Sequence, residues 1–156
     1  MPTQKLKDFL DSNGVKYIVM KHSEAYTAQE VAAAVHIDGK RIAKTVMVNL
    51  DGKMAMAVLP ASYQINFEQL KEETKAQKAE LSSEVEFKDR FPGCQTGAMP
   101  PFGNLYDMDV WVAATLVEDA DILFNAGTHS ELVKMAYNDF EALVRPKVIR
   151  FTVKAK

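Results

Sequence analysis

The sequence predicts a single α+β domain in which helices flank a central β-sheet that is mixed and largely antiparallel. Its 156 residues match the size of one compact domain. Segments with apolar residues at helical spacing are interspersed with β-rich runs. No internal repeat, low-complexity tract or linker divides the chain, so residues 1–156 are expected to form one domain.

The N-terminal part of the chain predicts a helix, a strand and a second helix. Apolar residues at helical spacing indicate a helix over residues 3–13, with Gly14 as its C-terminal cap. Residues 15–20 are rich in β-forming side chains and are expected to form a strand. Thr27 and Glu30 have the spacing of a capping box, which predicts that the second helix starts there.

The middle of the chain predicts a β-hairpin followed by helices. Residues 42–50 and 53–59 are two β-rich runs joined by Asp51-Gly52, the strongest short signal for a two-residue hairpin turn. Helical spacing then covers residues 66–80, and a shorter helix is expected over residues 83–91.

The C-terminal half returns to strand character after a loop that is dense in Gly and Pro. Thr128 and Glu131 form a further capping box ahead of four small or apolar residues, which predicts a helix there. The other expected elements are a loop over 92–103, strands over 108–115, 122–126 and 147–153, and a helical turn over 139–144.

Composition and charge exclude several classes of protein. The chain is 47% hydrophobic and 26% charged, as in an ordinary globular protein, and no stretch approaches the length of a membrane helix. A formal net charge of −2 argues against a protein that coats DNA or long RNA, and leaves contact with the tip of an RNA open. The single cysteine, Cys94, favours a reducing compartment, and we expect a cytoplasmic protein without a membrane partner.

Two groups of basic residues are candidate contacts for RNA phosphates. Each is at least as well explained as a solvated face, so neither is taken as part of a site. They are Lys71, Lys75 and Lys78 on the helix expected over 66–80, and Arg150, Lys154 and Lys156 along the last strand and its tail.

Lys44 is the first candidate for a functional side chain. Strand alternation places it on the same side as Ile42, Val46 and Val48, which is the more apolar face. Burying an ammonium group is costly unless acceptors or an anion meet it, so an inward lysine suits a phosphate or carboxylate ligand. The alternative is a lysine whose head reaches solvent at the sheet edge.

The second candidate is the loop from Gly97 to Gly103. Its paired prolines, Pro100 and Pro101, fix the backbone, while the flanking glycines allow close approach of a ligand. Backbone N–H groups held in such a loop can stabilise a developing oxyanion in ester hydrolysis. The alternative is a rigid turn between a helix and a strand.

The third candidate is the segment 125–130, which is expected to leave a strand and enter a helix. Its free N–H groups and the helix dipole would favour an anion, and His129 would lie in the first turn. His129 is able to act as an acid, a base or a hydrogen-bond donor. The alternative is a solvent-exposed histidine near a cap, as for His22 and His36, which are read as structural or exposed.

Motifs for other chemistries are absent from the sequence. It contains no GxSxG elbow, HExxH helix, P-loop or GxGxxG fingerprint. No paired His/Cys spacing offers a zinc site, so no metal or cofactor is expected. Cys94 lies in a loop without a recognisable activating partner, which disfavours a nucleophilic role.

The three candidates occur in the order and approximate spacing of the YbaK/prolyl-tRNA-editing domain family, and the resemblance covers nearly the whole chain. The run from Ala43 to Val48 resembles the family's strand with its functional lysine. Residues 97–101 match its Gly-x-x-x-Pro loop, followed here by Phe102-Gly103. Residues 126–129 are similar to its late glycine-containing segment, including the histidine of the prolyl-tRNA-editing branch.

The resemblance implies an aminoacyl-tRNA deacylase that hydrolyses the ester at the tRNA 3′ end with a water molecule, without metal, cofactor or covalent intermediate. It implies that Lys44 meets the terminal nucleotide, that Gly97 excludes or positions the aminoacyl group, and that His129 orients the substrate. Further residues implied to contact substrate are Thr45, Ala98, Met99, Pro101, Phe102, Gly127 and Thr128.

The expected partners are the 3′ acceptor end of an aminoacyl-tRNA and, as a second candidate, an aminoacyl-tRNA synthetase. Two alternatives use the same pocket. One is a non-catalytic module that binds the aminoacyl-tRNA end or a synthetase, and the other is a small-molecule esterase or amidase on the same fold.

Overall fold

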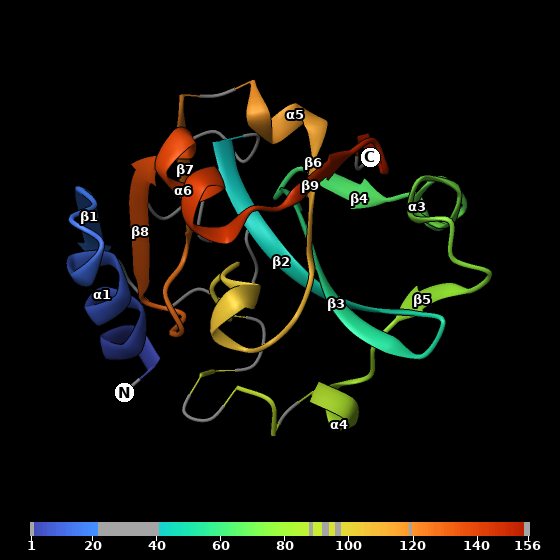
Figure 1. Cartoon of the computed structure of the whole chain (residues 1–156), viewed down its shortest axis with the longest axis horizontal. Coiled ribbons are helices and arrows are strands. Elements are labelled where there is room, and N and C mark those ends of the chain that lie inside the picture. Colours follow the sequence, from blue (N-terminus) through green and yellow to red (C-terminus); the bar gives the residue numbers. More distant parts are fainter. Residues whose placement is uncertain are drawn as a thin grey trace.

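The computed structural model describes residues 2–21, 41–87, 89–91, 94–95, 98–118 and 120–154. Within them, a mixed sheet forms the centre and short helices lie around it (Figure 1). The helix predicted from Thr27 lies outside the described residues, as do Gly97, His22 and His36.

Helices and strands alternate along the chain as in an α+β domain. The helices are α1 (Pro2–Ser12), α3 (Phe67–Thr74), α4 (Glu84–Phe87), α5 (Ala114–Val117) and α6 (Tyr137–Val144), with the 3₁₀ helix η2 (Gly103–Leu105). The strands are β1 (Tyr17–Lys21), β2 (Ile42–Leu50), β3 (Lys53–Pro60), β4 (Tyr63–Ile65), β5 (Ala79–Leu81), β6 (Val110–Ala113), β7 (Asp121–Asn125), β8 (Glu131–Ala136), β9 (Lys147–Ile149) and β10 (Thr152–Lys154).

Within the described ranges, the main sheet has eight strands in the order β1-β8-β7-β2-β3-β6-β9, with β5 paired to β2 beside this path. The pairs β1–β8, β7–β8, β2–β3 and β2–β5 are antiparallel, whereas β2–β7, β3–β6 and β6–β9 are parallel. A separate ribbon pairs β10 with β4. The predicted fold class, an α+β domain with a mixed sheet, is confirmed.

The hairpin predicted at Asp51-Gly52 is confirmed. β2 and β3 pair from Ala43–Pro60 to Leu50–Lys53. Asp51 and Gly52 both have positive φ, 53° and 83°, as a two-residue turn of this kind requires. The Asp51 carboxylate also accepts hydrogen bonds from the backbone N–H groups of Gln77 and Lys78, at 3.0 and 2.8 Å.

Two hydrophobic clusters pack helices and loops against the two faces of the sheet. One packs α1, through Leu6 and Leu10, and α6, through Phe140, against one face. The other packs α3, through Leu70, against the opposite face together with Phe151. Figure 1 shows α1 beside β8 at the left and α3 at the right, so the clusters stabilise different parts of the sheet.

The helix predicted over residues 66–80 is wrong in length, because α3 ends at Thr74. Asn66 caps its start by accepting a hydrogen bond from the Gln69 N–H, and Lys75 adopts the left-handed conformation just past its end. The backbone N–H groups of Gln77 and Lys78 donate to the Asp51 carboxylate, so they are not available for the hydrogen bonds of a longer helix. The chain then continues as β5. Lys71, Lys75 and Lys78 therefore do not share a helical face.

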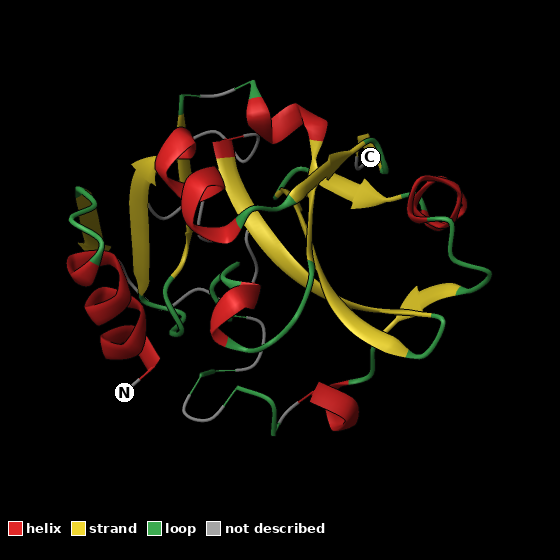
Figure 2. Cartoon of the chain, in the orientation of Figure 1, coloured by secondary structure: helices red, strands yellow, loops and turns green. Residues whose placement is uncertain are grey.

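The helix predicted after Thr128 and Glu131 is wrong, because Glu131–Ala136 forms β8 (Figure 2). β8 pairs on both edges, with β1 and with β7. Leu132 is buried on one face, and Val133 and Met135 on the other. A strand buried on both faces lacks the alternation that distinguishes it from a helix in sequence, and tertiary pairing decides the structure.

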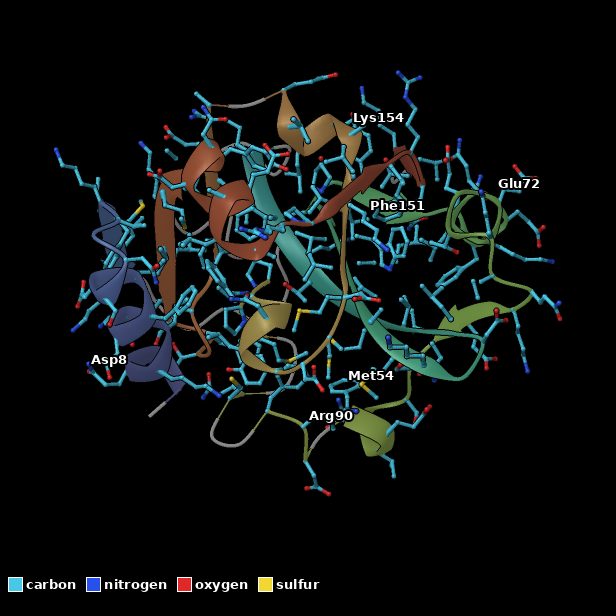
Figure 3. The ribbon with its side chains drawn as sticks, in the orientation of Figure 1. Asp8, Met54, Glu72, Arg90, Phe151 and Lys154 are labelled. Atoms are coloured by element: carbon cyan, nitrogen blue, oxygen red, sulfur yellow. The ribbon has the colours of Figure 1, made fainter. Side chains whose placement is uncertain are left out.

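The C-terminal strand predicted over 147–153 is divided into β9 and β10, which belong to different sheets. Phe151, between them, is fully buried in the second cluster and marks the place where the chain passes from one sheet to the other (Figure 3). Arg150 precedes this break and Lys154 follows it, so the two do not lie along one strand. The short helix predicted over 83–91 is the single turn of α4, and the strand predicted over 108–115 is β6 followed by α5.

Candidate functional site

The candidate site lies along one edge of β2, where pairing with β7 ends and pairing with β5 has not yet begun. Residues 42–43 of β2 pair in parallel with residues 123–124 of β7, and residues 48–50 pair with β5. Among the described strands, none pairs with this edge of β2 at residues 44–46. The edge of the sheet is thus interrupted between the end of β7 and the end of β5, and Lys44 lies at that interruption.

Lys44 lies half-buried on the face of β2 that also carries Val46. Its Nζ donates a hydrogen bond to the backbone oxygen of Ala61 at 3.3 Å. Within the described residues it forms no salt bridge. Burial lowers the pKa of Lys44 below its ordinary value of 10.5, because removal of water disfavours the ammonium form. The side chain is thus held in place by one neutral acceptor while its charge is available to an anion.

A cavity of about 290 Å³ lies beside Lys44. Its lining residues come from β2, β3, β4, β5 and the start of α3. Its walls are mainly apolar and include one amide side chain. They are formed by Lys44, Val46, Leu59, Gln64, Ile65, Phe67 and Leu81.

On the other side of Lys44, β7 ends at Asn125 and the chain turns back into β8 through residues 126–130. Gly127 has a φ of 102°, a conformation that residues with a Cβ rarely adopt, so glycine is needed at this turn. The loop joins two antiparallel strands, and the predicted helix N-terminus at His129 is therefore wrong. The helix dipole cannot contribute to anion binding here.

His129 is buried, with 5% of its surface exposed. Its backbone N–H donates a hydrogen bond of 2.6 Å to the Oε1 of Gln95. The alternative of an exposed histidine is thereby excluded.

Gln95 connects this hairpin loop to the loop predicted to carry Gly97. The Gln95 backbone N–H donates to the Gly127 oxygen at 2.9 Å, and the Gly127 N–H donates to the Ala98 oxygen at 2.8 Å. With the side-chain bond to His129, these contacts bring the second and third sequence candidates together. Sequence reasoning missed Gln95, because its importance comes from a partner 34 residues away.

The residues after Gly97 form the buried base of this arrangement. Ala98, Met99, Pro101 and Phe102 are all buried. Phe102 packs its ring against those of Phe9, Phe124 and Phe140, with centroids 6.1, 5.4 and 5.4 Å apart. Its side chain belongs to the core, so it supports the loop and does not line the cavity beside Lys44.

At Gly103, the end of the loop packs closely against the backbone of Met108 and the side chain of Val110. A Cβ at this position would clash with the Met108 backbone oxygen and would lie 2.6 Å from the Val110 Cγ2. The loop that starts near Gly97 is therefore fixed at its far end by backbone packing.

Two polar atoms near the interruption have no hydrogen-bond partner in the described structure. They are the buried Asn125 Oδ1 and Thr128 Oγ1, both at the hairpin end of β7. Thr45 is partly buried on the opposite face of β2 from Lys44. The structure thus brings Ala98, Gly127 and His129 together through hydrogen bonds that include Gln95, whereas Lys44 and Thr45 lie on opposite faces of β2 just after its pairing with β7.

Cys94 is poorly suited to act as a nucleophile. Burial raises the pKa of its thiol, although the Tyr106 hydroxyl at 3.8 Å and Lys5 partly oppose this. Since the thiolate is the reactive form, the thiol is held in its less reactive state.

Two further observations bear on cofactors and membranes. Among the described residues, no group of three or more His, Cys, Asp or Glu side chains is placed to hold a metal ion. Within the same residues, no helix has the length and apolar character needed to cross a membrane.

The fold and the interrupted sheet edge define a small α+β domain with one candidate site formed by a strand and two loops. The model of a protein family described as the aminoacyl-tRNA editing domain matches residues 22–143. The chain therefore belongs to the aminoacyl-tRNA editing domain family, as the resemblance implied. A comparison with curated protein sequences gave no match.

Solved structures share the fold at low sequence identity. The crystal structure of hypothetical protein APE2540 matches with a TM-score of 0.85 and 18% identity, covering 96% of this chain and 99% of that one. A candidate trans-editing enzyme for prolyl tRNA synthetase matches with a TM-score of 0.81 and 16% identity, covering 99% and 98%. A candidate signal transduction protein from Marinobacter aquaeolei VT8 matches with a TM-score of 0.71 and 14% identity, covering 96% of this chain and 30% of that one. These similarities show the fold.

Proposed function

We propose that the protein is a trans-editing aminoacyl-tRNA deacylase, a hydrolase of translation quality control that acts in the cytoplasm. The observation that carries the proposal is the half-buried Lys44 at the interruption of the sheet edge, beside two hydrogen-bonded loops, in a chain of the editing-domain family. A solved structure of the same fold described as a candidate trans-editing enzyme for prolyl tRNA synthetase supports it.

In the proposed reaction, a water molecule attacks the carbonyl carbon of the ester between the amino acid and the terminal ribose. The ester C–O bond breaks, the ribose hydroxyl leaves with a proton, and the products are a free amino acid and an uncharged tRNA. Negative charge develops on the carbonyl oxygen, and backbone N–H groups in a fixed loop are suited to stabilise it.

We assign to the candidate residues the roles that the family resemblance implies. Lys44 binds the terminal nucleotide, because its ammonium group meets only a neutral oxygen in the described protein and an anionic phosphate would pair with it. Gly97 positions the aminoacyl group or excludes the wrong one. His129, held through its backbone by Gln95, orients the substrate. Thr45, Ala98, Met99, Pro101, Gly127 and Thr128 shape the site around these groups.

Single-turnover hydrolysis of a panel of mischarged tRNAs, including mischarged tRNA specific for proline, tests the proposal. We expect at least one ester to be hydrolysed well above its spontaneous rate, with simple esters unaffected. Binding that leaves the ester intact would instead indicate a non-catalytic module. Hydrolysis of simple esters without any dependence on tRNA would indicate a small-molecule esterase.

A further inference from the structure

Another pocket, of about 360 Å³, lies among α3, α5 and the C-terminal residues around β10. Figure 1 shows α3, α5 and the C-terminus in the upper right part of the view. The pocket shares no lining residue with the cavity beside Lys44, and the proposed reaction uses none of its side chains. It is lined by Gln69, Ala114, Thr115, Glu118, Arg150 and Thr152, so all but one of the lining side chains are polar.

The walls of this pocket are held together through Asn66. The backbone N–H of Asn66 donates to the oxygen of the fully buried Phe151 at 2.7 Å, and Arg150 and Thr152 flank Phe151 in the chain. The side chain of the same Asn66 accepts a hydrogen bond of 3.1 Å from the N–H of Gln69 on α3. The wall from the C-terminal segment and the wall from α3 are therefore fixed to one residue, which preorganises the pocket for a ligand.

The pocket carries one side chain of each charge. Glu118 and Arg150 both line it, and within the described residues neither belongs to a salt bridge. Arg150 alone would suit an RNA phosphate, as considered from the sequence, but the carboxylate of Glu118 in the same pocket would repel a phosphate group. A ligand that itself carries both charges would instead pair with both side chains.

The remaining lining groups favour a small polar ligand. The Oγ1 of Thr115 is buried and has no hydrogen-bond partner among the described residues, which is a costly arrangement for a hydroxyl group. Rotation between side-chain rotamers allows this hydroxyl to meet a ligand group in the pocket. Gln69 and Thr152 add an amide and a second hydroxyl, which are able to donate and to accept.

We propose that this pocket binds a free α-amino acid. The carboxylate of the ligand pairs with the guanidinium group of Arg150, whose planar fork matches a carboxylate, and its ammonium group pairs with Glu118. The polar groups of Gln69, Thr115 and Thr152 meet the rest of the ligand. This site is separate from the proposed deacylation, and its test needs no tRNA.

NMR titration of the full chain with L-threonine tests the proposal, because the hydroxyl of threonine suits the polar lining. The amides of residues 69, 114–118 and 150–152 should shift, with a Kd on the order of 1 mM. N-acetyl-threonine lacks the ammonium group and threonine amide lacks the carboxylate. Each derivative should bind the native protein about tenfold more weakly than threonine, because each loses one charged hydrogen bond.

Two variants assign the charges of the ligand to the side chains. Arg150→Gln and Glu118→Gln should each raise the Kd for threonine about tenfold. Blocking the ammonium group should cost less in Glu118→Gln than in the native protein, and blocking the carboxylate should cost less in Arg150→Gln, because the partner is already gone.

Arg90→Gln and Glu72→Gln are the matched controls. Both residues are exposed, neither lines the pocket, and both are marked in Figure 3. These variants should bind threonine as the native protein does. Circular dichroism establishes that each variant is folded, and the comparison of threonine with its two blocked derivatives on the native protein does not depend on any variant.

Three results would overturn the proposal. One is the absence of shifts at the named amides with threonine at up to about 10 mM. Another is equal binding of threonine and its blocked derivatives. The third is binding of inorganic phosphate at the same amides at least as tightly as threonine, which would make the pocket a site for anions.

Discussion

Lys44 is a half-buried lysine on β2, just after the residues that pair with β7. Burial lowers its pKa, and its hydrogen bond to the Ala61 backbone oxygen does not neutralise the charge. Lys44→Met keeps most of the volume of the side chain and removes the charge. We expect deacylation to fall more than tenfold, while the thermal midpoint stays the same or rises slightly, because the desolvation cost disappears.

Lys53→Met is the control for this prediction, because Lys53 lies on the same hairpin and is exposed. Its pair with Asp109 at 3.6 Å is on the surface and should contribute little to stability. Deacylation by this variant should match the native rate. Unchanged deacylation by a folded Lys44→Met variant would remove Lys44 from the site.

The lowered pKa of Lys44 predicts how activity depends on pH. The charged form is lost at a lower pH than for an exposed lysine, so the enzymatic rate, corrected for spontaneous hydrolysis, should fall on the alkaline side below pH 10.5. Folding stability should rise over the same window, because the unfolded state then holds more protons than the folded one. In Lys44→Arg the charge persists to higher pH, so any activity that this variant retains should lack the alkaline fall.

Gln95 is predicted to position the two loops without touching the reacting atoms. Gln95→Leu removes the acceptor for the His129 N–H, whereas Gln95→Glu keeps an oxygen in its place. We expect the leucine variant to lower kcat by about tenfold with a smaller change in KM, because misplacement of the loops affects the transition state most. The glutamate variant should restore most of the loss, and equal defects in both variants would contradict the positioning role.

The sequence located the candidate residues to different degrees. The face of β2 on which Lys44 lies was predicted correctly, because strand alternation fixes it and that face carries the apolar residues expected. The predicted setting of His129 was wrong, because the helix predicted after it is a strand. Gln95 could not be found, because a hydrogen bond to a residue far along the chain leaves no local pattern.

The β2–β3 hairpin depends on Asp51 in two ways that can be separated. Its backbone tolerates positive φ, and its carboxylate binds the N–H groups of Gln77 and Lys78. Asp51→Ala should lower the free energy of unfolding by about 1–2 kcal/mol, since it removes both contributions at an exposed site. Asp51→Asn keeps the turn preference and one acceptor and should cost less. Urea denaturation measures both, and equal stabilities of the two variants and the native protein would show that these bonds contribute nothing.

Among the elements, the β2–β3 hairpin was more predictable than the extent of α3 or the strand β8. The two-residue turn requires positive φ at both positions, and Asp51-Gly52 is a pair that favours this conformation. The turn can therefore be predicted from two residues alone. The extent of α3 depends on Asp51, which binds the chain beyond it, and β8 depends on neighbours on both edges. The length of α3 and the strand conformation of β8 are thus set by tertiary contacts, which a local sequence pattern does not reveal.

The net charge of −2 limits how the whole molecule meets a polyanion. With α3 shortened, the three lysines after residue 70 no longer form one face, which removes one of the two basic patches considered. We expect weak unassisted binding to tRNA, with a salt dependence equivalent to roughly one to four phosphate contacts. Binding measured from low to moderate salt should be similar for full tRNA and for a minihelix with only the acceptor arm. A slope that demands eight or more contacts, with much tighter binding of full tRNA, would contradict this.

The order of strands in the sheet has a consequence for how the protein is made. β1 pairs with β8, so that Tyr17 lies opposite Met135, and β7 lies between β8 and β2. β1 therefore has no described partner until β8 has been synthesised. Contacts so distant in sequence slow folding, because a long loop must close before they form. The nascent chain should accordingly remain incompletely folded until β8 has left the ribosome, a period in which it depends on protection from aggregation.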